Sequence, residues 1–276
     1  MKRIIIFIIL LLFCYSCSTH VVFGPKDLNM DLVNDPKIRI GALENGLRYV
    51  IRVNVNPEKK AEFRLGVNVG SLQEDEDKQG AAHFIEHMAF NGTDHFSQKE
   101  LFDFFQDNGM SFGADLNAST SHTKTIYRFS LPTNQKEVID KGFLILEDWA
   151  HGIRFQKEEV DKERNIIIEE LRAIKSVDKR VKDQVMPLVY GPSYLNRLPI
   201  GKKSIIETIG HETLKEAYRK WYQPERISVV VVGDIDPDEI ERKIKSTFAG
   251  LKNSENNPEL LDFDIPKYTA FQYLNV

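Results

Sequence analysis

The chain has 276 residues, of which 42% are hydrophobic and 28% are charged, and its formal net charge is −4. This composition is ordinary for a globular protein, and the length allows one large domain or two small ones. The chain lacks the clustered basic face that nucleic-acid binding requires, so that class of function is set aside.

The N-terminal segment has the pattern of an export signal. Two basic residues, Lys2 and Arg3, precede a run at residues 4–13 without a charged or polar side chain. An apolar run of about ten residues is too short to cross a bilayer as a helix, but it is typical of a signal peptide. We therefore predict that residues 1–16 are a signal peptide.

The only two cysteines, Cys14 and Cys17, follow this run. Small Ser16 precedes Cys17, whereas bulky Phe13 precedes Cys14, and processing requires a small residue before the cleaved bond. The segment resembles a bacterial lipobox. That resemblance implies a lipid on Cys17 and a lipid-anchored place in the bacterial cell envelope, at the periplasm or outer membrane. The alternative is a plain signal peptide. In either case no cysteine pair remains, so a metal site must use His, Asp and Glu.

Period-two alternation of apolar residues predicts most of the strands. The alternating segments are residues 38–40, 47–53, 61–70 and 125–131, with a turn at 44–46. The small, polar stretch 112–120 is predicted to be an edge strand paired with 125–131. The run 227–232 is almost entirely β-branched, which favours a buried strand.

Helical patterns lie between these strands. The predicted helices are residues 79–91, 97–107, 134–151, 157–178, 211–221 and 237–249. Ser97 and Glu100 form a capping-box pattern at the start of the second helix. The stretch 179–203 has a mixed pattern interrupted by Gly191-Pro192, and no element is predicted there.

The grouping of strands with helix pairs predicts an α+β fold with a largely antiparallel sheet. Residues 17–37 show little periodicity and are predicted to be a tether. The main domain is predicted at 38–255. Residues 256–276 are predicted to be a linker and the start of a truncated second domain, because an apolar stretch begins at 266.

One helix carries residues suited to metal chemistry. His83 and His87 are four residues apart, so a helix presents both imidazoles on one face. Two histidines at this spacing can bind one tetrahedral zinc ion. Glu86 lies between them and can accept a proton from a metal-bound water. The pattern H-x-x-E-H is an inverted zinc motif, although two such histidines can also be a surface pair or satisfied core groups.

Residues 83–93, with the sequence HFIEHMAFNGT, resemble the signature of the insulinase/pitrilysin-type zinc peptidases, which include the mitochondrial processing peptidases. The resemblance implies a sheet with helices packed on one face. It also implies a third zinc ligand, a Glu on a later helix, seven residues after another acidic residue. Glu163 and Glu170 have that spacing, which implies that Glu170 is the ligand and that Glu163 orients a histidine.

Glu169 is the competing candidate for the third ligand. A step of one residue turns it by about 100° around the helix from Glu170. The three acids could also form a solvated acidic face, which is the commoner arrangement for such runs.

The segment around Asn117 and Ala118 resembles the family's edge strand beside the zinc, where an extended substrate pairs with the strand. An open strand edge is a physical template for binding a peptide. The resemblance covers residues 40 to about 255. Family members usually have a second homologous half, which implies that a second peptidase-like half or subunit is a partner here.

The predicted function is zinc-dependent hydrolysis of extended peptides or unfolded proteins, with Glu86 as the catalytic base. One alternative is a non-catalytic or partner-dependent subunit that binds peptides. Another is a surface lipoprotein without a metal, such as an adhesion module.

Overall fold

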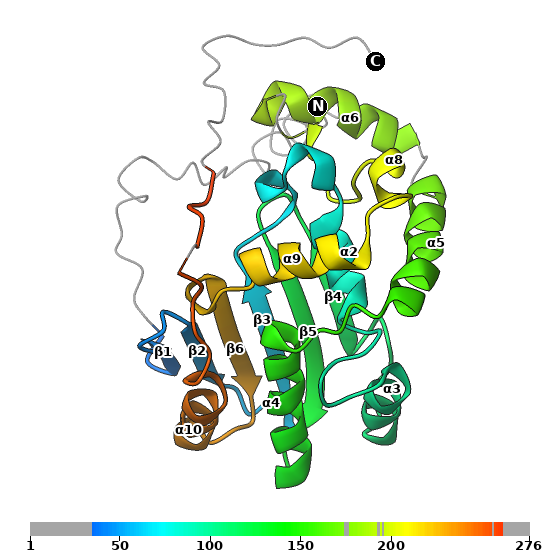
Figure 1. Ribbon diagram of the computed structural model, residues 1–276. Helices are drawn as coiled ribbons and strands as arrows, with labels where there is room; N and C mark the ends of the chain where they lie inside the picture. The colour runs from blue at the N-terminus through cyan, green and yellow to red at the C-terminus, as the bar shows by residue number, and fades with distance from the viewer. Residues whose placement is uncertain (1–34, 174–176, 192–193, 195, 256, 262–276) are drawn as a thin grey trace, which may run out of the picture. The chain divides into compact units, whose positions relative to one another are not determined.

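The computed structural model describes residues 35–173, 177–191, 194, 196–255 and 257–261 (Figure 1). The chain separates into two compact units, Met1–Pro36 and Lys37–Val276, and nearly all described residues belong to the second. The predicted signal peptide, both cysteines and almost all of the predicted tether lie outside the described residues. Residues 262–276, which make up most of the predicted C-terminal segment, also lie outside the described residues.

A six-stranded sheet forms the centre of the second unit, in the order β1-β2-β6-β3-β5-β4. The strands are β1 (Ile38–Ala42), β2 (Arg48–Val53), β3 (Lys60–Val67), β4 (Leu116–Thr120), β5 (Thr125–Pro132) and β6 (Ile227–Gly233). Neighbours are antiparallel except for β2 and β6, which are parallel. The predicted α+β fold with a largely antiparallel sheet is therefore confirmed.

The helices match the predicted pattern except for α6 and the short α8, which were not predicted. They are α2 (Ala81–Met88), α3 (Gln98–Asp107), α4 (Lys136–His151), α5 (Lys157–Ala173), α6 (Val177–Tyr190), α8 (Lys203–Ile206), α9 (His211–Trp221) and α10 (Pro237–Phe248). The capping box of Ser97 and Glu100 is present. In the part of the chain that is described, no helix combines the length and the apolar character needed to span a bilayer.

No element was predicted at residues 179–203, and this was wrong for the first part of the stretch, which belongs to the helix α6. Pro187 lowers the helix propensity of this segment, since proline lacks a backbone donor. However, valines recur every fourth residue from Val177 to Val189, which is the spacing of one helix side. Within the predicted helix 157–178, α5 covers Lys157–Ala173 and α6 begins at Val177, while residues 174–176 lie outside the described residues.

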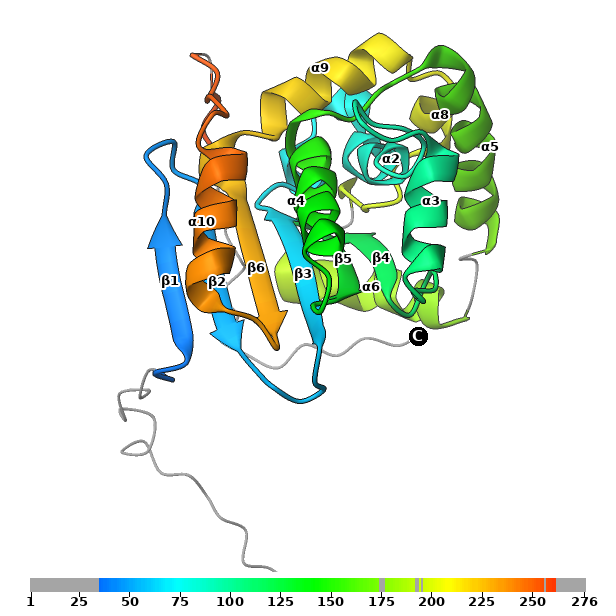
Figure 2. The same cartoon turned by 90° about the horizontal axis from the view of Figure 1, so that it is seen from below.

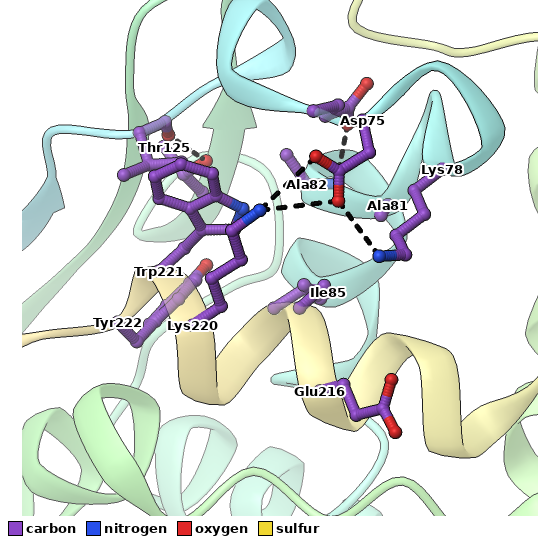
Figure 3. A pocket seen from close by; sticks show the side chains of 13 residues that line it. Asp75, Lys78, Ala81, Ala82, Ile85, Thr125, Glu216, Lys220, Trp221 and Tyr222 are labelled. Carbon is purple, nitrogen blue, oxygen red and sulfur yellow. Dashed lines mark hydrogen bonds and ion pairs between the residues drawn. The ribbon is translucent and has the colours of Figure 1, made fainter. Parts of the chain in front are cut away.

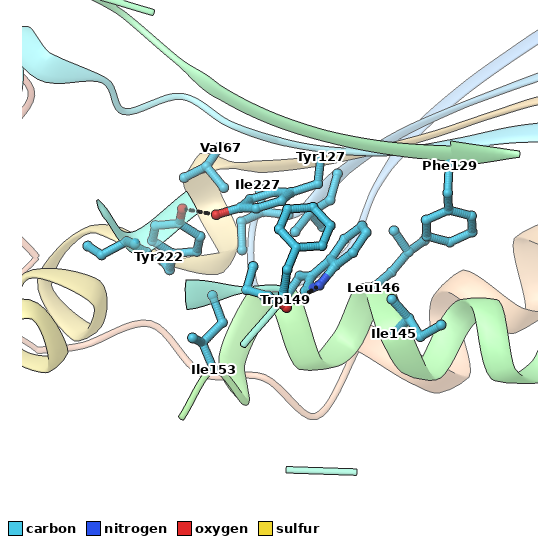
Figure 4. Close-up of a cluster of buried hydrophobic side chains, with 14 of the residues drawn as sticks. Val67, Tyr127, Phe129, Ile145, Leu146, Trp149, Ile153, Tyr222 and Ile227 are labelled. Atoms are coloured by element: carbon cyan, nitrogen blue, oxygen red, sulfur yellow. Dashed lines mark hydrogen bonds between the residues drawn. The ribbon is translucent and has the colours of Figure 1, made fainter. Parts of the chain in front are cut away.

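Helices α2, α4 and α10 lie against one face of the sheet, and Figure 2 shows α4 and α10 in front of the strands. Alternate residues of the strands point into this layer and are buried. Figure 4 shows Tyr127 and Phe129 of β5 beside Trp149 of α4, with ring centroids 5.1 and 5.5 Å from the Trp149 ring. Each such buried aromatic stabilises the fold by roughly 1.5–3 kcal/mol.

Both ends of α2 are held by other parts of the chain. At the N-terminus, the carboxylate of Glu74 accepts hydrogen bonds from the backbone N–H groups of Gly80 and Ala82, both at 2.8 Å. Burial raises the pKa of the Glu74 carboxyl to about 8, against the opposing effect of these bonds. At the C-terminus, the indole N–H of Trp149 donates to the carbonyl of Ala89 at 3.0 Å. The helix that carries both histidines is therefore fixed relative to α4.

Gly80, which precedes α2, should tolerate no side chain. Its φ is +99°, and an added Cβ would lie 2.5 Å from Ile206 Cδ1 and 3.0 Å from Gly201 Cα. We expect Gly80→Ala to lower the free energy of unfolding by about 2–4 kcal/mol, from left-handed strain and overpacking together. Urea denaturation of the purified chain measures this loss.

Gly109→Ala is the matched control, because Gly109 has φ +76° and open space around the added Cβ. We expect Gly109→Ala to lower the free energy of unfolding by only about 1–2 kcal/mol, the cost of the left-handed backbone alone. Equal losses at the two positions would show that close packing at Gly80 contributes nothing.

Candidate metal centre

The two histidines of α2 face the same point. His83 and His87 have ring centroids 4.6 Å apart and Nε2 atoms 3.2 Å apart. Both side chains are largely buried. Their convergence follows from the four-residue spacing on a helix whose apolar side, with Phe84, Ile85 and Met88, is buried in the core.

Helix α5 packs against α2 and brings carboxylates to the histidines. Glu170 Oε2 lies 3.5 Å from His87 Nε2 and 3.8 Å from His83 Nε2. Glu169 lies elsewhere on the helix, where it forms an ion pair with Arg172. The structure therefore brings Glu170, and not Glu169, to the imidazole pair.

These three side chains have the donor set and spacing of a zinc site. Their ligand atoms all lie within 4.8 Å of one another. Zinc bonds of about 2.0–2.2 Å in a tetrahedral arrangement place ligand atoms about 3.4 Å apart, which is close to the observed separations. Two histidines and one glutamate also leave a fourth position for water, as catalytic zinc sites do. The residues fit a zinc ion.

Glu163 lies behind His87 and hydrogen-bonds the ring nitrogen that faces away from the shared point. Its Oε1 is 2.6 Å from His87 Nδ1, and its Oε2 accepts a hydrogen bond from Asn91 Nδ2 at 2.8 Å. A proton on Nδ1 that donates to Glu163 leaves the Nε2 lone pair directed at the shared point. Asn91 also donates to the carbonyl of His87 at 3.1 Å, so it ties Glu163 to α2.

Without a metal ion, a proton on the imidazole pair is favoured on His87 and disfavoured on His83. Burial opposes a charge on His87, but hydrogen bonds and charge interactions with Glu163 and Glu170 outweigh it and raise its pKa to about 9. Burial and the neighbouring charge of His87 lower the pKa of His83 to about 4. A metal ion must therefore displace a proton from His87 when it binds, so its affinity increases with pH.

Glu86 is beside the metal ligands but outside their group. Its side chain is buried, and its Oε2 accepts a hydrogen bond from Thr120 Oγ1 at 2.5 Å. Burial raises the pKa of the Glu86 carboxyl to about 6, and the hydrogen bond from Thr120 opposes this shift. A carboxylate with a raised pKa near a metal-bound water is suited to accept a proton.

Asn117 and Ala118 lie on β4, the last strand of the sheet, which has β5 as its only neighbour among the described strands. Ala118 is opposite Tyr127 and faces the helices, whereas Asn117 is opposite Arg128 and faces the other side. The Asn117 amide hydrogen-bonds its own local backbone, at Gly113 and Ala118. Contact of these residues with a substrate stays a prediction.

A cavity of about 190 Å³ lies on another side of α2, against α9 (Figure 3). Ala81, Ala82 and Ile85 line it from α2, and Lys220 lines it from α9. None of the residues that form the candidate metal centre lines this cavity.

Asn91 and Thr120 were missed by the sequence analysis. Asn91 was only the last residue of the predicted helix 79–91, and its bond to Glu163 joins residues 72 positions apart. Thr120 is 34 positions from Glu86 and belongs to a different element. No local pattern indicates such contacts, because they depend on how the elements pack.

The chain is similar to known proteins in sequence and in fold. Residues 49–197 match the family Insulinase (Peptidase family M16), and residues 208–274 match Peptidase M16 inactive domain. The candidate ligands, Glu86 and Thr120 all lie within the first match.

The chain is 38% identical over 229 residues to the probable zinc protease PqqL of Escherichia coli, covering 82% of this chain and 25% of the relative. It is 34% identical to the protein of the same name from Haemophilus influenzae, covering 93% and 28%. The crystal structure of the periplasmic protease PqqL from Escherichia coli matches with a TM-score of 0.80 and 36% identity, covering 86% of this chain and 26% of that one. The chain thus spans about a quarter of the length of these relatives.

Zinc should stabilise the chain through Glu170. At a free zinc concentration 100 times the dissociation constant, we expect about 2.7 kcal/mol of added stability in the wild type and little in Glu170→Ala. Thermal unfolding with and without zinc measures the difference. Because His87 must lose a proton, the apparent zinc affinity should increase from pH 6 to pH 8.

Glu169→Ala removes the same charge one residue away and is the control. It should keep the full zinc effect, since Glu169 is paired with Arg172. Loss of zinc stabilisation in Glu169→Ala, with retention in Glu170→Ala, would reverse the assignment.

Proposed function

Because this chain belongs to the insulinase family of peptidases (peptidase family M16), we propose that it forms the catalytic zinc centre of a metalloendopeptidase acting on extended peptides or unfolded proteins. The observation that carries the proposal is the convergence of His83, His87 and Glu170 beside the buried carboxylate of Glu86. The two bacterial relatives are named probable zinc proteases, which supports the same reaction.

In the proposed mechanism His83, His87 and Glu170 hold zinc, and Glu163 holds the His87 ring in its tautomer. When bound, zinc supplies a Lewis acid that polarises the scissile carbonyl and acidifies a water molecule. Glu86 accepts the water proton as the water oxygen bonds to the carbonyl carbon. Glu86 then transfers that proton to the amine nitrogen as the carbon–nitrogen bond breaks.

The proposed substrate lies along the free edge of β4. An extended peptide can pair with the backbone of this strand near Asn117 and Ala118, as an added strand of the sheet. The strand ends at Thr120, which contacts Glu86, so a peptide paired with β4 would lie beside the proposed base. Backbone pairing recognises extended segments regardless of sequence, which suits unfolded chains.

The proposed reaction involves more than the described domain. The relatives are about four times as long as the match to this chain. We propose that a second peptidase-like half, in the same polypeptide or in a partner subunit, takes part in substrate binding. The proposed boundaries of the zinc-binding domain remain residues 38–255.

We also propose that the protein is lipid-anchored in the cell envelope through Cys17. The solved relative is described as a periplasmic protease, which supports export. In the native host, Cys17→Ala should move the protein from the membrane fraction to the soluble fraction. Cys14→Ala, three residues earlier, should leave it in the membrane fraction. Unchanged fractionation of Cys17→Ala would count against a lipid on this sulfur.

Glu86→Gln should abolish hydrolysis while keeping zinc. Amide nitrogen and oxygen cannot accept the water proton, and loss of a general base lowers kcat by about 100-fold to 10,000-fold. Cleavage of an unstructured peptide, with and without a chelator, together with the zinc content of each protein, tests this expectation.

Glu169→Gln is the control, because it removes a negative charge near the centre from an exposed side chain. It should cleave at the wild-type rate. A Glu86→Gln variant that cleaves as fast as the wild type, or a wild type indifferent to chelation, would contradict the mechanism.

A further inference from the structure

We propose that Thr120 is a positioning residue for Glu86, and that its hydroxyl links the base to the strand on which the peptide lies. The proposal rests on the proposed peptidase function. Thr120 is the last residue of β4, and its Oγ1 donates to Glu86 Oε2 at 2.5 Å. A hydroxyl bonded to a carboxylate at this distance forms a strong, charge-assisted hydrogen bond.

The direction of this bond follows from the neighbouring hydroxyl. Thr125 Oγ1 donates its only hydrogen to the carbonyl of Val69 at 3.1 Å. Thr125 Oγ1 also lies 3.4 Å from Thr120 Oγ1, where it can act only as an acceptor. The Thr120 hydroxyl has two acceptors within reach, Thr125 Oγ1 and the Glu86 carboxylate. The carboxylate is both nearer and charged. The hydrogen of the Thr120 hydroxyl therefore points at Glu86.

The position of the Thr120 hydroxyl is fixed by the sheet. Thr120 and Thr125 are opposite each other in the β4–β5 register, so both side chains are on the face that α2 covers. Thr125 is 1% exposed and anchored to Val69, which follows β3. The hydroxyl that contacts Glu86 is thus held by β4, by β5 and by the segment that follows β3, independently of the helix that carries Glu86.

This contact assigns different tasks to the two oxygens of the carboxylate. Oε2 is occupied by Thr120, which leaves Oε1 to accept a proton from water. Glu86 is only 7% exposed, so loss of the donor at Oε2 is costly for a largely buried carboxylate. Without the hydroxyl, the carboxylate would be free to rotate away from the productive orientation or towards the metal.

The same residue also connects the base to substrate binding. Thr120 belongs to the strand whose free edge is proposed to pair with the peptide. A peptide bound at this edge makes β4 an inner strand, which restricts the backbone that carries the Thr120 hydroxyl. The orientation of Glu86 is therefore coupled to occupation of the edge.

Kinetics of Thr120→Val and Thr120→Ser, each compared with the wild-type chain, test the role. Valine keeps the shape and the strand propensity but lacks the hydroxyl. We expect Thr120→Val to lower kcat roughly 10-fold to 100-fold, as expected for loss of a hydrogen bond to a charged group, with KM and zinc content unchanged. Thr120→Ser should restore most of the lost kcat. Thr208→Val, the same change at an exposed threonine outside the proposed site, is the control and should match the wild type.

Some kinetic results would overturn the proposal. They are an unchanged kcat in Thr120→Val, an effect confined to KM, or a Thr120→Ser variant as impaired as Thr120→Val. A change only in KM would assign Thr120 to the peptide edge alone.

A double-mutant cycle in thermal unfolding tests the contact without relying on activity. Thr120→Val should lower Tm in the wild type but much less in a Glu86→Ala background, where the carboxylate is absent. Additive losses would overturn the proposal. If the proposed hydrolase function is wrong, the wild type will cleave the peptide no better than Glu86→Gln. That outcome would not change the result of the double-mutant cycle, which measures unfolding and not activity.

Discussion

The packing of α2 against α5 is the contact on which the candidate metal centre depends. It brings His83 and His87 to Glu170, a carboxylate more than eighty positions away in the chain. Ile167 is fully buried between Glu163 and Glu170, so the acidic side of α5 is drawn against α2 by apolar burial. The Arg164 guanidinium lies 5.7 Å from the ring centroid of Phe84, which adds a second contact between the helices.

That packing also creates the electrostatic character of the site. Burial alone would keep both imidazoles neutral, but Glu163 and Glu170 make a positive charge favourable on His87. The negative charges of Glu163 and Glu170 thus favour a positive charge at this site, even when that charge is only a proton on His87. Glu163 is itself held by Asn91, so the charge that orients His87 has its own hydrogen-bonded support. Such support restricts the ligands to one arrangement.

The second constraint on the site comes from the sheet. The histidines and Glu86 sit on a helix that is capped by Glu74 and tied to Trp149. The proposed peptide edge lies on β4, one of the two edge strands of the sheet. Thr120 connects these two parts through the carboxylate of Glu86. The proposed zinc ligands, base and substrate edge therefore come from three elements, and only their packing brings them together.

The sequence by itself determined the features that depend on local periodicity. The pairing of His83 and His87, the capping box at Ser97 and the alternation of the strands all follow from spacings within a few residues. Only the tertiary structure decided the proximity of Glu170 rather than Glu169, the contacts of Thr120 and Asn91, and the insertion of β6 between β2 and β3. These features depend on which surfaces, distant in the sequence, pack against each other. A local sequence pattern indicates that a face is apolar, but it does not indicate which element covers that face.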